Sequence, residues 1–191
     1  MGGKEKLKPI LEASYQNQKE AKKTLEKAGY TYDKTLSTNE SKVFVDKQGR
    51  PNIAFRGSKT AKDFLVSDVA LAFGLENKTP RFQEAKRLTK LVERKYEKPV
   101  DVFGHSLGSA LAEKSGAKGQ IVTFNKGAGI RDIGKTIPKN QLDIRTSRDP
   151  VSIVSLLQKH PHNNLVTLES PTWQNPIQAH SIENVKHNLF V

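Results

Sequence analysis

The fold is decided by one stretch of sequence: VDVF (100–103), then GHSLG (104–108), then SALAEKSGA (109–117). The first four residues form a short, mainly apolar run of the kind that fills a buried strand. The last nine are mostly small residues in a helical pattern. Between them, Gly104 and Gly108 allow a sharp turn that joins a strand directly to a helix. The stretch therefore predicts a strand, a tight elbow with Ser106 at its tip, and a helix.

Outward from this stretch, short strands and helices alternate along most of the chain. The patterns predict helices over 5–28, 60–68, 80–97, 152–157 and 180–190, and further strands over 30–36, 42–46, 52–56, 120–124, 142–147 and 164–170. The turn KQGRP (47–51) joins two of these strands in a β-hairpin. Such alternation favours an α/β sandwich with a largely parallel sheet. We expect one domain over 1–191, with a basic helical segment over 1–40 packed on it or appended to it.

Composition limits the chemistry that the chain can perform. The chain has 191 residues, no cysteine and a formal net charge of +12. The lack of cysteine excludes disulfides, thiolate metal sites and cysteine nucleophiles. The first 99 residues hold 22 of the 32 lysines and arginines. This charge fits a solvated surface, an anionic membrane surface or nucleic acid. Lysines scattered among acids favour the first, and the lack of a base-reading motif weighs against specific nucleic-acid binding.

The sequence shows no segment that would insert into a membrane. No apolar run approaches the ~20 residues that a membrane span needs. The segment MGGKEKLKPILEAS (1–14) is charged and lacks the apolar core of a signal peptide. We therefore expect a soluble intracellular protein, or one associated peripherally with a membrane or particle. The patterns do not indicate an oligomeric state.

The elbow carries the residue types that a serine nucleophile needs. A serine hydroxyl attacks a carbonyl only when it is exposed, oriented and deprotonated by a neighbouring base. The turn exposes Ser106, and the helix that follows offers backbone N–H groups and a positive dipole end to a developing oxyanion. We therefore expect acyl transfer at Ser106. A glycine-rich turn with an incidental serine is the alternative.

Three segments together resemble a known family. GHSLGSALA (104–112) resembles the nucleophile elbow of the class 3 lipases, the fungal-triacylglycerol-lipase-like branch of the α/β hydrolases. IAFRGS (53–58), followed by DFL (63–65), resembles the family's F-R-G-(S/T) strand and D-W-L helix. QIVTF (120–124) is similar to the family's V-x-T-F-G strand. The resemblance covers 42–182 and implies a trimmed three-layer α/β-hydrolase-like sandwich. The expected fold is this sandwich with a largely parallel central sheet, together with the N-terminal helix and the β-hairpin that the patterns predict.

The resemblance also implies roles for four further residues. Ser58 and the backbone N–H of Leu107 correspond to the oxyanion hole. Asp149, in an R-D-P-V segment after a strand, resembles the family's acid. His180, beside Ser181 and Ile182, resembles the late histidine that serves as the base. The implied mechanism is a Ser106-Asp149-His180 triad that forms an acyl-enzyme, with no metal or cofactor.

The residues leave weaker alternatives for the acid and the base. Asp143 lies inside a strand pattern and Asp132 in a glycine-flanked loop, so both are poorer candidates for the acid. His105 should point away from its neighbour Ser106. The remaining histidines are His187, deeper in the last helix, and His160 and His162, which suit a surface loop better than a metal site.

The chain departs from the family after the third segment. Asn125 stands where the family has Gly, and the following Pro-Arg pair is absent. The spacings of 43 residues from Ser106 to Asp149 and 31 from Asp149 to His180 are short for the family. VALAFGL (69–75) lies near the family's lid position, with Gly74 as a hinge, although its pattern fits an ordinary core strand better.

Three functional hypotheses follow. The leading one is a serine hydrolase for lipid-like carboxylic esters, of the lipase, phospholipase or esterase type, with a lipid or small ester as substrate. The second is a non-catalytic, membrane- or particle-associated scaffold on a lipase-like fold. The third is a nucleic-acid-binding module. The combination of Ser106, Asp149 and His180 favours the first.

Overall fold

The computed structural model describes residues 6–58, 79–161, 164–186, 189 and 191. Several sequence expectations lie outside these residues: the helix over 60–68, the DFL segment, the strand or lid over 69–75, and the histidines His162 and His187.

A seven-stranded sheet forms the centre of the molecule, and its strands lie side by side in chain order. They are β1 (Thr31–Tyr32), β2 (Ser41–Val45), β3 (Pro51–Phe55), β4 (Asp101–His105), β5 (Ile121–Phe124), β6 (Gln141–Thr146) and β7 (Leu165–Leu168). The first three pair in antiparallel fashion, and β3 to β7 are parallel. Parallel neighbours need long crossover connections, which carry the helices over the faces of the sheet. The carboxyl ends of β3 to β7 therefore lie along one edge.

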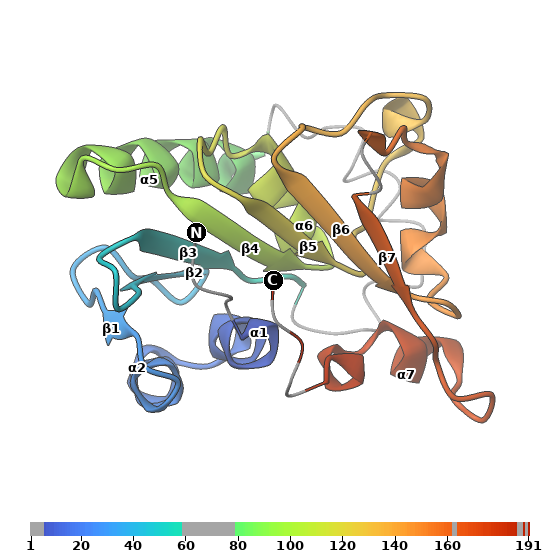
Figure 1. Cartoon of the computed structure of the whole chain (residues 1–191), viewed down its shortest axis with the longest axis horizontal. Helices are drawn as coiled ribbons and strands as arrows, with labels where there is room; N and C mark the ends of the chain where they lie inside the picture. The colour runs from blue at the N-terminus through green and yellow to red at the C-terminus, as the bar shows by residue number, and fades with distance from the viewer. Residues whose placement is uncertain (1–5, 59–78, 162–163, 187–188, 190) are drawn as a thin grey trace.

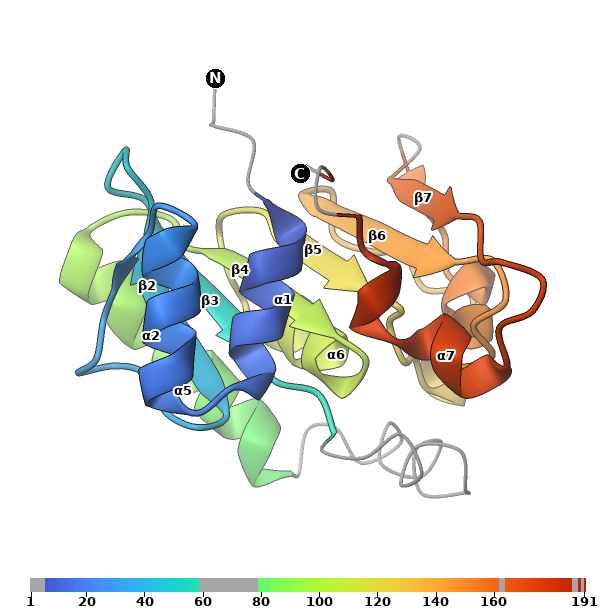
Figure 2. The same ribbon diagram turned by 90° about the horizontal axis from the view of Figure 1, so that it is seen from below.

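Helices cover both faces of the sheet (Figures 1 and 2). α1 (Leu7–Tyr15), α2 (Gln18–Lys27) and the short α7 (Pro176–His180) lie on one side, and α5 (Pro80–Tyr96) and α6 (Leu107–Lys114) on the other. The described residues also include the 3-10 helices η2 (Ile130–Asp132), η3 (Val151–Leu157) and η5 (Ile182–Asn184). The expected α/β sandwich with a largely parallel sheet is confirmed.

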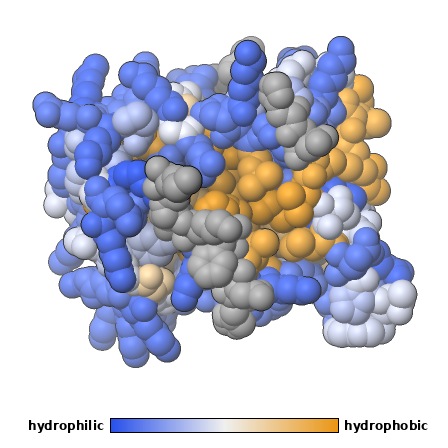
Figure 3. Space-filling model, in the orientation of Figure 1, coloured by the Kyte–Doolittle hydropathy of each residue, from blue (hydrophilic) through white to orange (hydrophobic). Residues whose placement is uncertain are grey.

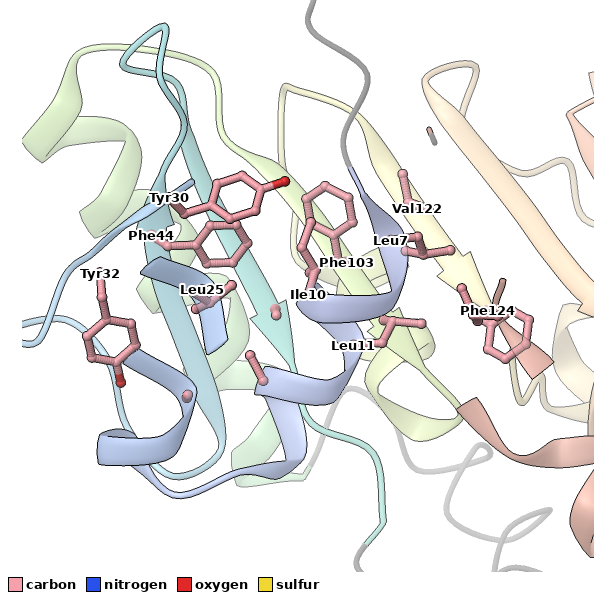
Figure 4. Close-up of a cluster of buried hydrophobic side chains, with 14 of the residues drawn as sticks. Leu7, Ile10, Leu11, Leu25, Tyr30, Tyr32, Phe44, Phe103, Val122 and Phe124 are labelled. Carbon is pink, nitrogen blue, oxygen red and sulfur yellow. The ribbon is translucent and has the colours of Figure 1, made fainter. Parts of the chain in front are cut away.

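Each face of the sheet has its own hydrophobic core. Under α1 and α2, fully buried Leu7, Ile10 and Leu11 pack against aromatic side chains of the sheet such as Phe44 and Phe103 (Figure 4). The opposite core joins α5 and α6 to the sheet, and includes Ile53, Phe82, Leu88, Val92, Val102 and Leu111. The basic N-terminal segment thus supplies one of the two layers that bury the sheet.

The expected helix over 5–28 is wrong in one respect, because it is two helices. α1 ends at Tyr15, Gln16 is extended, and Asn17 begins α2 by accepting the backbone N–H of Glu20 on its side chain at 3.0 Å. An Asn followed three residues later by Glu is a typical helix start, so the sequence carried the signal for this break.

The expected strand over 30–36 is shorter than predicted. Only Thr31 and Tyr32 pair with β2, since the Asp33 carboxylate accepts the backbone N–H groups of Thr35 and Leu36 and turns the chain. Such local bonds to Asp compete with a strand's ladder.

The expected terminal helix over 180–190 is also wrong. α7 starts earlier, at Pro176, behind a capping box formed by Asn175 and Gln178, and it ends at His180. Pro at the first helical position and Asn at the cap explain this start. His180 therefore closes a helix instead of opening one.

The face of the molecule seen in Figure 3 is divided between polar and apolar regions. Hydrophilic side chains dominate the side where α2 and α5 lie, and hydrophobic ones gather toward β6, β7 and η3. Exposed apolar side chains there include Ile153, Leu156 and Leu157 of η3 and Val166 of β7. No helix within the described ranges is both long and apolar enough to cross a membrane.

The contribution of α1 to the core is testable with one pair of variants. Leu11→Ala should lower the free energy of unfolding by about 2–5 kcal/mol, because it removes a fully buried side chain and leaves a cavity. Leu156→Ala makes the same change at an exposed position of η3 and should stay within about 0.5 kcal/mol of wild type. Urea titration followed by circular dichroism measures both. Equal, small effects would show that α1 does not stabilise the fold.

Candidate active site

Ser106 lies at a strained turn between β4 and α6. Its backbone has φ 61° and ψ −126°, a conformation that non-glycine residues rarely adopt. The neighbouring glycines are required by space: a Cβ on Gly104 would overlap the backbone of Gly108, and one on Gly108 would overlap the carbonyl oxygen of Phe55. The elbow predicted from the sequence is therefore present, and β3 packs directly against it.

The elbow is also tied to β5. The backbone N–H of Ser106 donates to the carbonyl of Phe124 at 3.1 Å. The Ser109 hydroxyl donates to the carbonyl of Gly104 at 2.7 Å and accepts the N–H of Phe124 at 3.2 Å. These bonds hold Ser106 in place. The expectation that the turn exposes Ser106 is wrong, because only 1% of its surface is exposed. Among the described residues its Oγ has no hydrogen-bond partner.

Asp149 lies in the loop that follows β6 and is almost completely buried. Its carboxylate accepts the backbone N–H groups of Val151 and Ser152 at 3.0 and 3.1 Å, and the Nδ1–H of His180 at 2.9 Å. Burial raises the pKa of this carboxyl, but the bonds from His180, Ser152 and Val151 and the charge of His180 outweigh it, and the net pKa is lowered. Asp149 is therefore ionised at neutral pH.

His180 is held by both its ring and its backbone. An ionised carboxylate can only accept, so Nδ1 of His180 carries a proton, and Nε2 is the nitrogen that can act as a base when it is unprotonated. The ring centroids of His180 and His105 are 4.7 Å apart. Because His105 precedes Ser106, this contact places the Asp149–His180 pair beside the elbow.

His105 points away from Ser106, as expected, and binds the backbone of His180. Its Nε2–H donates to the carbonyl of His180 at 2.7 Å. A carbonyl only accepts, so Nε2 of His105 bears the proton. Burial and the nearby His180 lower the pKa of His105 to about 3, so the ring is neutral. His105 thus supports the position of His180.

Asn125 is a site residue that the sequence analysis treated only as a departure from a family pattern. Its backbone has a positive φ of 46°. Its side-chain oxygen accepts the N–H of Thr146 at 2.8 Å, and its amide nitrogen donates to the carbonyls of Ala179 and His180 at 3.2 and 3.1 Å. It therefore joins the end of β6, near Asp149, to the end of α7. Asn is the residue type that best replaces Gly at positive φ, which was the available signal.

The loop after β3 brings the predicted oxyanion residues close to the elbow. A Cβ on Gly57 would lie 2.7 Å from the carbonyl oxygen of His105 and 3.2 Å from the Cβ of Ser106. Ser58 follows directly. Leu107 is the first residue of α6, and the first N–H groups of a helix have no partner inside it. The two proposed backbone donors are thus carried by segments on either side of Ser106.

The weaker candidates lie in other clusters. Asp143 binds Lys126 at 2.6 Å and Nε2 of His160 at 3.0 Å. Asp132 pairs with Lys114 and Lys135. Neither acid contacts His180 in the described structure. No group of three or more His, Asp or Glu side chains suited to a metal ion is found within those described ranges.

The fold is an α/β sandwich with a largely parallel sheet, and the candidate site lies at the carboxyl ends of its strands. The chain matches the sequence model of the phospholipase-like family, described as the Tle-like phospholipase domain, over residues 8–163, and it belongs to this family. Among solved structures, it is similar to the crystal structure of Lip2 lipase from Yarrowia lipolytica, with 15% identity, 76% of this chain and 72% of that chain covered, and a TM-score of 0.46. No curated protein matches the chain.

The neutral, buried state of His105 predicts a pH dependence of stability. Its pKa is about 3 in the folded protein against an ordinary value of 6.5. Below pH 6.5, His105 binds a proton in the unfolded chain but not in the folded protein. Proton binding therefore favours the unfolded state, and the free energy of unfolding decreases as the pH falls from about 6.5 toward 3. The free energy of unfolding should therefore fall more steeply in wild type than in His105→Gln between pH 6.5 and 5. Urea titrations at each pH measure this, and parallel curves would contradict it.

Proposed function

We propose that the chain hydrolyses carboxylic esters of phospholipids, with Ser106 as nucleophile. The carrying observation is the buried hydrogen bond between Asp149 and Nδ1 of His180, beside a strained elbow that holds a serine without a described partner for its hydroxyl. Membership of a phospholipase-like family supports the substrate class. We extend the family assignment to the class 3 lipase branch on the elbow and the F-R-G-S segment.

In the proposed reaction, Nε2 of His180 takes the Ser106 hydroxyl proton as Oγ attacks the ester carbonyl. Asp149 keeps the ring in the required tautomer and stabilises the imidazolium that forms. The backbone N–H groups of Leu107 and Ser58 would stabilise the negative charge on the tetrahedral intermediate. His180 then protonates the leaving alcohol, and water releases the acyl group by the same steps.

Labelling with a fluorophosphonate tests for an activated serine. The probe should modify Ser106, located by mass spectrometry, and Ser106→Ala should not be labelled. Ser115→Ala removes another buried hydroxyl, at the far end of α6, and should label like wild type. With vesicles of phosphatidylcholine and phosphatidylglycerol, fatty acid release should disappear in Ser106→Ala only. A folded wild type that is neither labelled nor active would instead support a scaffold role.

The role of Asp149 is testable separately. Asp149→Asn should lower kcat by about 10²- to 10⁴-fold, because an amide no longer selects the tautomer with a basic Nε2. Asp101→Asn is the matched control: this buried acid begins β4, at the end of the strand opposite Ser106. Steady-state hydrolysis of a p-nitrophenyl ester measures both. Retained activity in Asp149→Asn would remove Asp149 from the triad.

A further inference from the structure

The hydroxyl of Tyr15, the last residue of α1, lies where three parts of the candidate site meet. Its oxygen is 2.7 Å from Nδ1 of His105, and the two rings meet edge to face with centroids 5.7 Å apart. A Cβ on Gly57 would overlap this hydroxyl, so the loop after β3 passes directly over it. Tyr15 is 90 residues from His105 in the chain, and no sequence pattern links them.

The direction of the hydrogen bond follows from the tautomer of His105. Its Nε2–H donates to the carbonyl of His180, and the ring is neutral, so Nδ1 can only accept. The Tyr15 O–H must therefore donate to Nδ1. The hydroxyl oxygen also packs against the backbone of Gly57, since a Cβ on Gly57 would overlap it.

A continuous chain of contacts results. The Gly57 backbone packs on the Tyr15 hydroxyl, which is hydrogen-bonded to the ring of His105, and this ring is hydrogen-bonded to the carbonyl of His180. One end belongs to the loop that carries Ser58, and the other to the residue proposed as the base. Tyr15 itself is fixed because α1 buries Leu7, Ile10 and Leu11 against the sheet (Figure 4).

We propose that Tyr15 is a positioning residue for ester hydrolysis, which sets the distance between the oxyanion loop and His180. The inference rests on the proposed function and assigns the N-terminal helix a part in it. Tyr15 acts through Gly57 and His105, and it is not itself a catalytic residue. The position of the reacting groups matters for the rate, since a displacement of ~1 Å can lower the rate about 10²-fold.

The test compares Tyr15→Phe with Tyr32→Phe. Both remove one phenol oxygen from the N-terminal part of the chain, but Tyr32 lies in β1, the edge strand of the sheet, which β2 and β3 separate from β4. With the fluorophosphonate probe, Tyr15→Phe should lower the maximal labelling rate of Ser106 at least about tenfold. The probe concentration that gives half the maximal rate should stay unchanged, because binding is not altered. Tyr32→Phe should match wild type in both.

A spectroscopic measurement tests the same bond without any activity. In ¹⁵N-histidine NMR spectra, wild-type His105 should be the neutral Nε2–H tautomer with a hydrogen-bonded Nδ1. In Tyr15→Phe the Nδ1 resonance should move toward that of a free pyridine-type nitrogen, while Nε2 stays protonated. A wild-type Nδ1–H tautomer would overturn the proposal even if Tyr15→Phe failed to fold.

The remaining outcomes separate this proposal from the proposed function. If wild type is labelled and Tyr15→Phe is labelled at the same rate, the positioning role is overturned and the hydrolase proposal stays intact. Wild type that is folded but not labelled would overturn the hydrolase proposal, and the positioning role with it. Tyr15→Phe could also label more slowly because it binds the probe more weakly, with an unchanged His105 spectrum. This result would indicate a loss of probe binding and would also overturn the positioning role.

Discussion

The close approach of three backbone segments around Ser106 is the constraint on which the rest of the structure depends. Gly108 packs on the carbonyl of Phe55, Gly104 packs on Gly108, and Gly57 lies against His105 and Ser106. None of these contacts leaves room for a Cβ. They bring the start of α6, the end of β4 and the loop after β3 within contact of one another. A site made of N–H donors and a serine needs such proximity, because hydrogen bonds act only over about 3 Å.

The sheet brings the residues of the candidate site to one edge. Because β3, β4, β5 and β6 are parallel neighbours, their carboxyl ends lie in a row. Ser58, Ser106, Asn125 and Asp149 each follow the end of one of these strands, in that order. His180 follows β7 in the chain, so the parallel strands do not fix its position. Asn125 and His105 hold it by hydrogen bonds to its backbone carbonyl.

Burial explains why so many polar groups in this region are paired. Asp149 and His180 are nearly inaccessible to water, and an unpaired buried charge would be strongly destabilising. The same rule accounts for the second buried cluster, where Lys126 lies between the carboxylates of Glu113 and Asp143. In that cluster each charge meets an opposite one at 2.6–2.7 Å, so its acids are committed to ion pairs. Asp143 also binds His160, but it shares its carboxylate with Lys126, whereas the Asp149 carboxylate binds His180 and two backbone N–H groups.

The sequence by itself determined the elbow, the alternation of strands and helices, and the largely parallel sheet, since these follow from local spacing and from glycines that no other residue could replace. Asp149 and His180 were expected from family resemblance, and the structure brings them together. Local cap residues, Asn17 for α2 and Asn175 with Pro176 for α7, marked the break before α2 and the early start of α7. The expected helices followed the apolar spacing and did not use these signals. The contacts of Tyr15 and Asn125 were decided only by the tertiary structure, because their partners lie tens of residues away and nothing in local spacing records which distant backbone a side chain will meet.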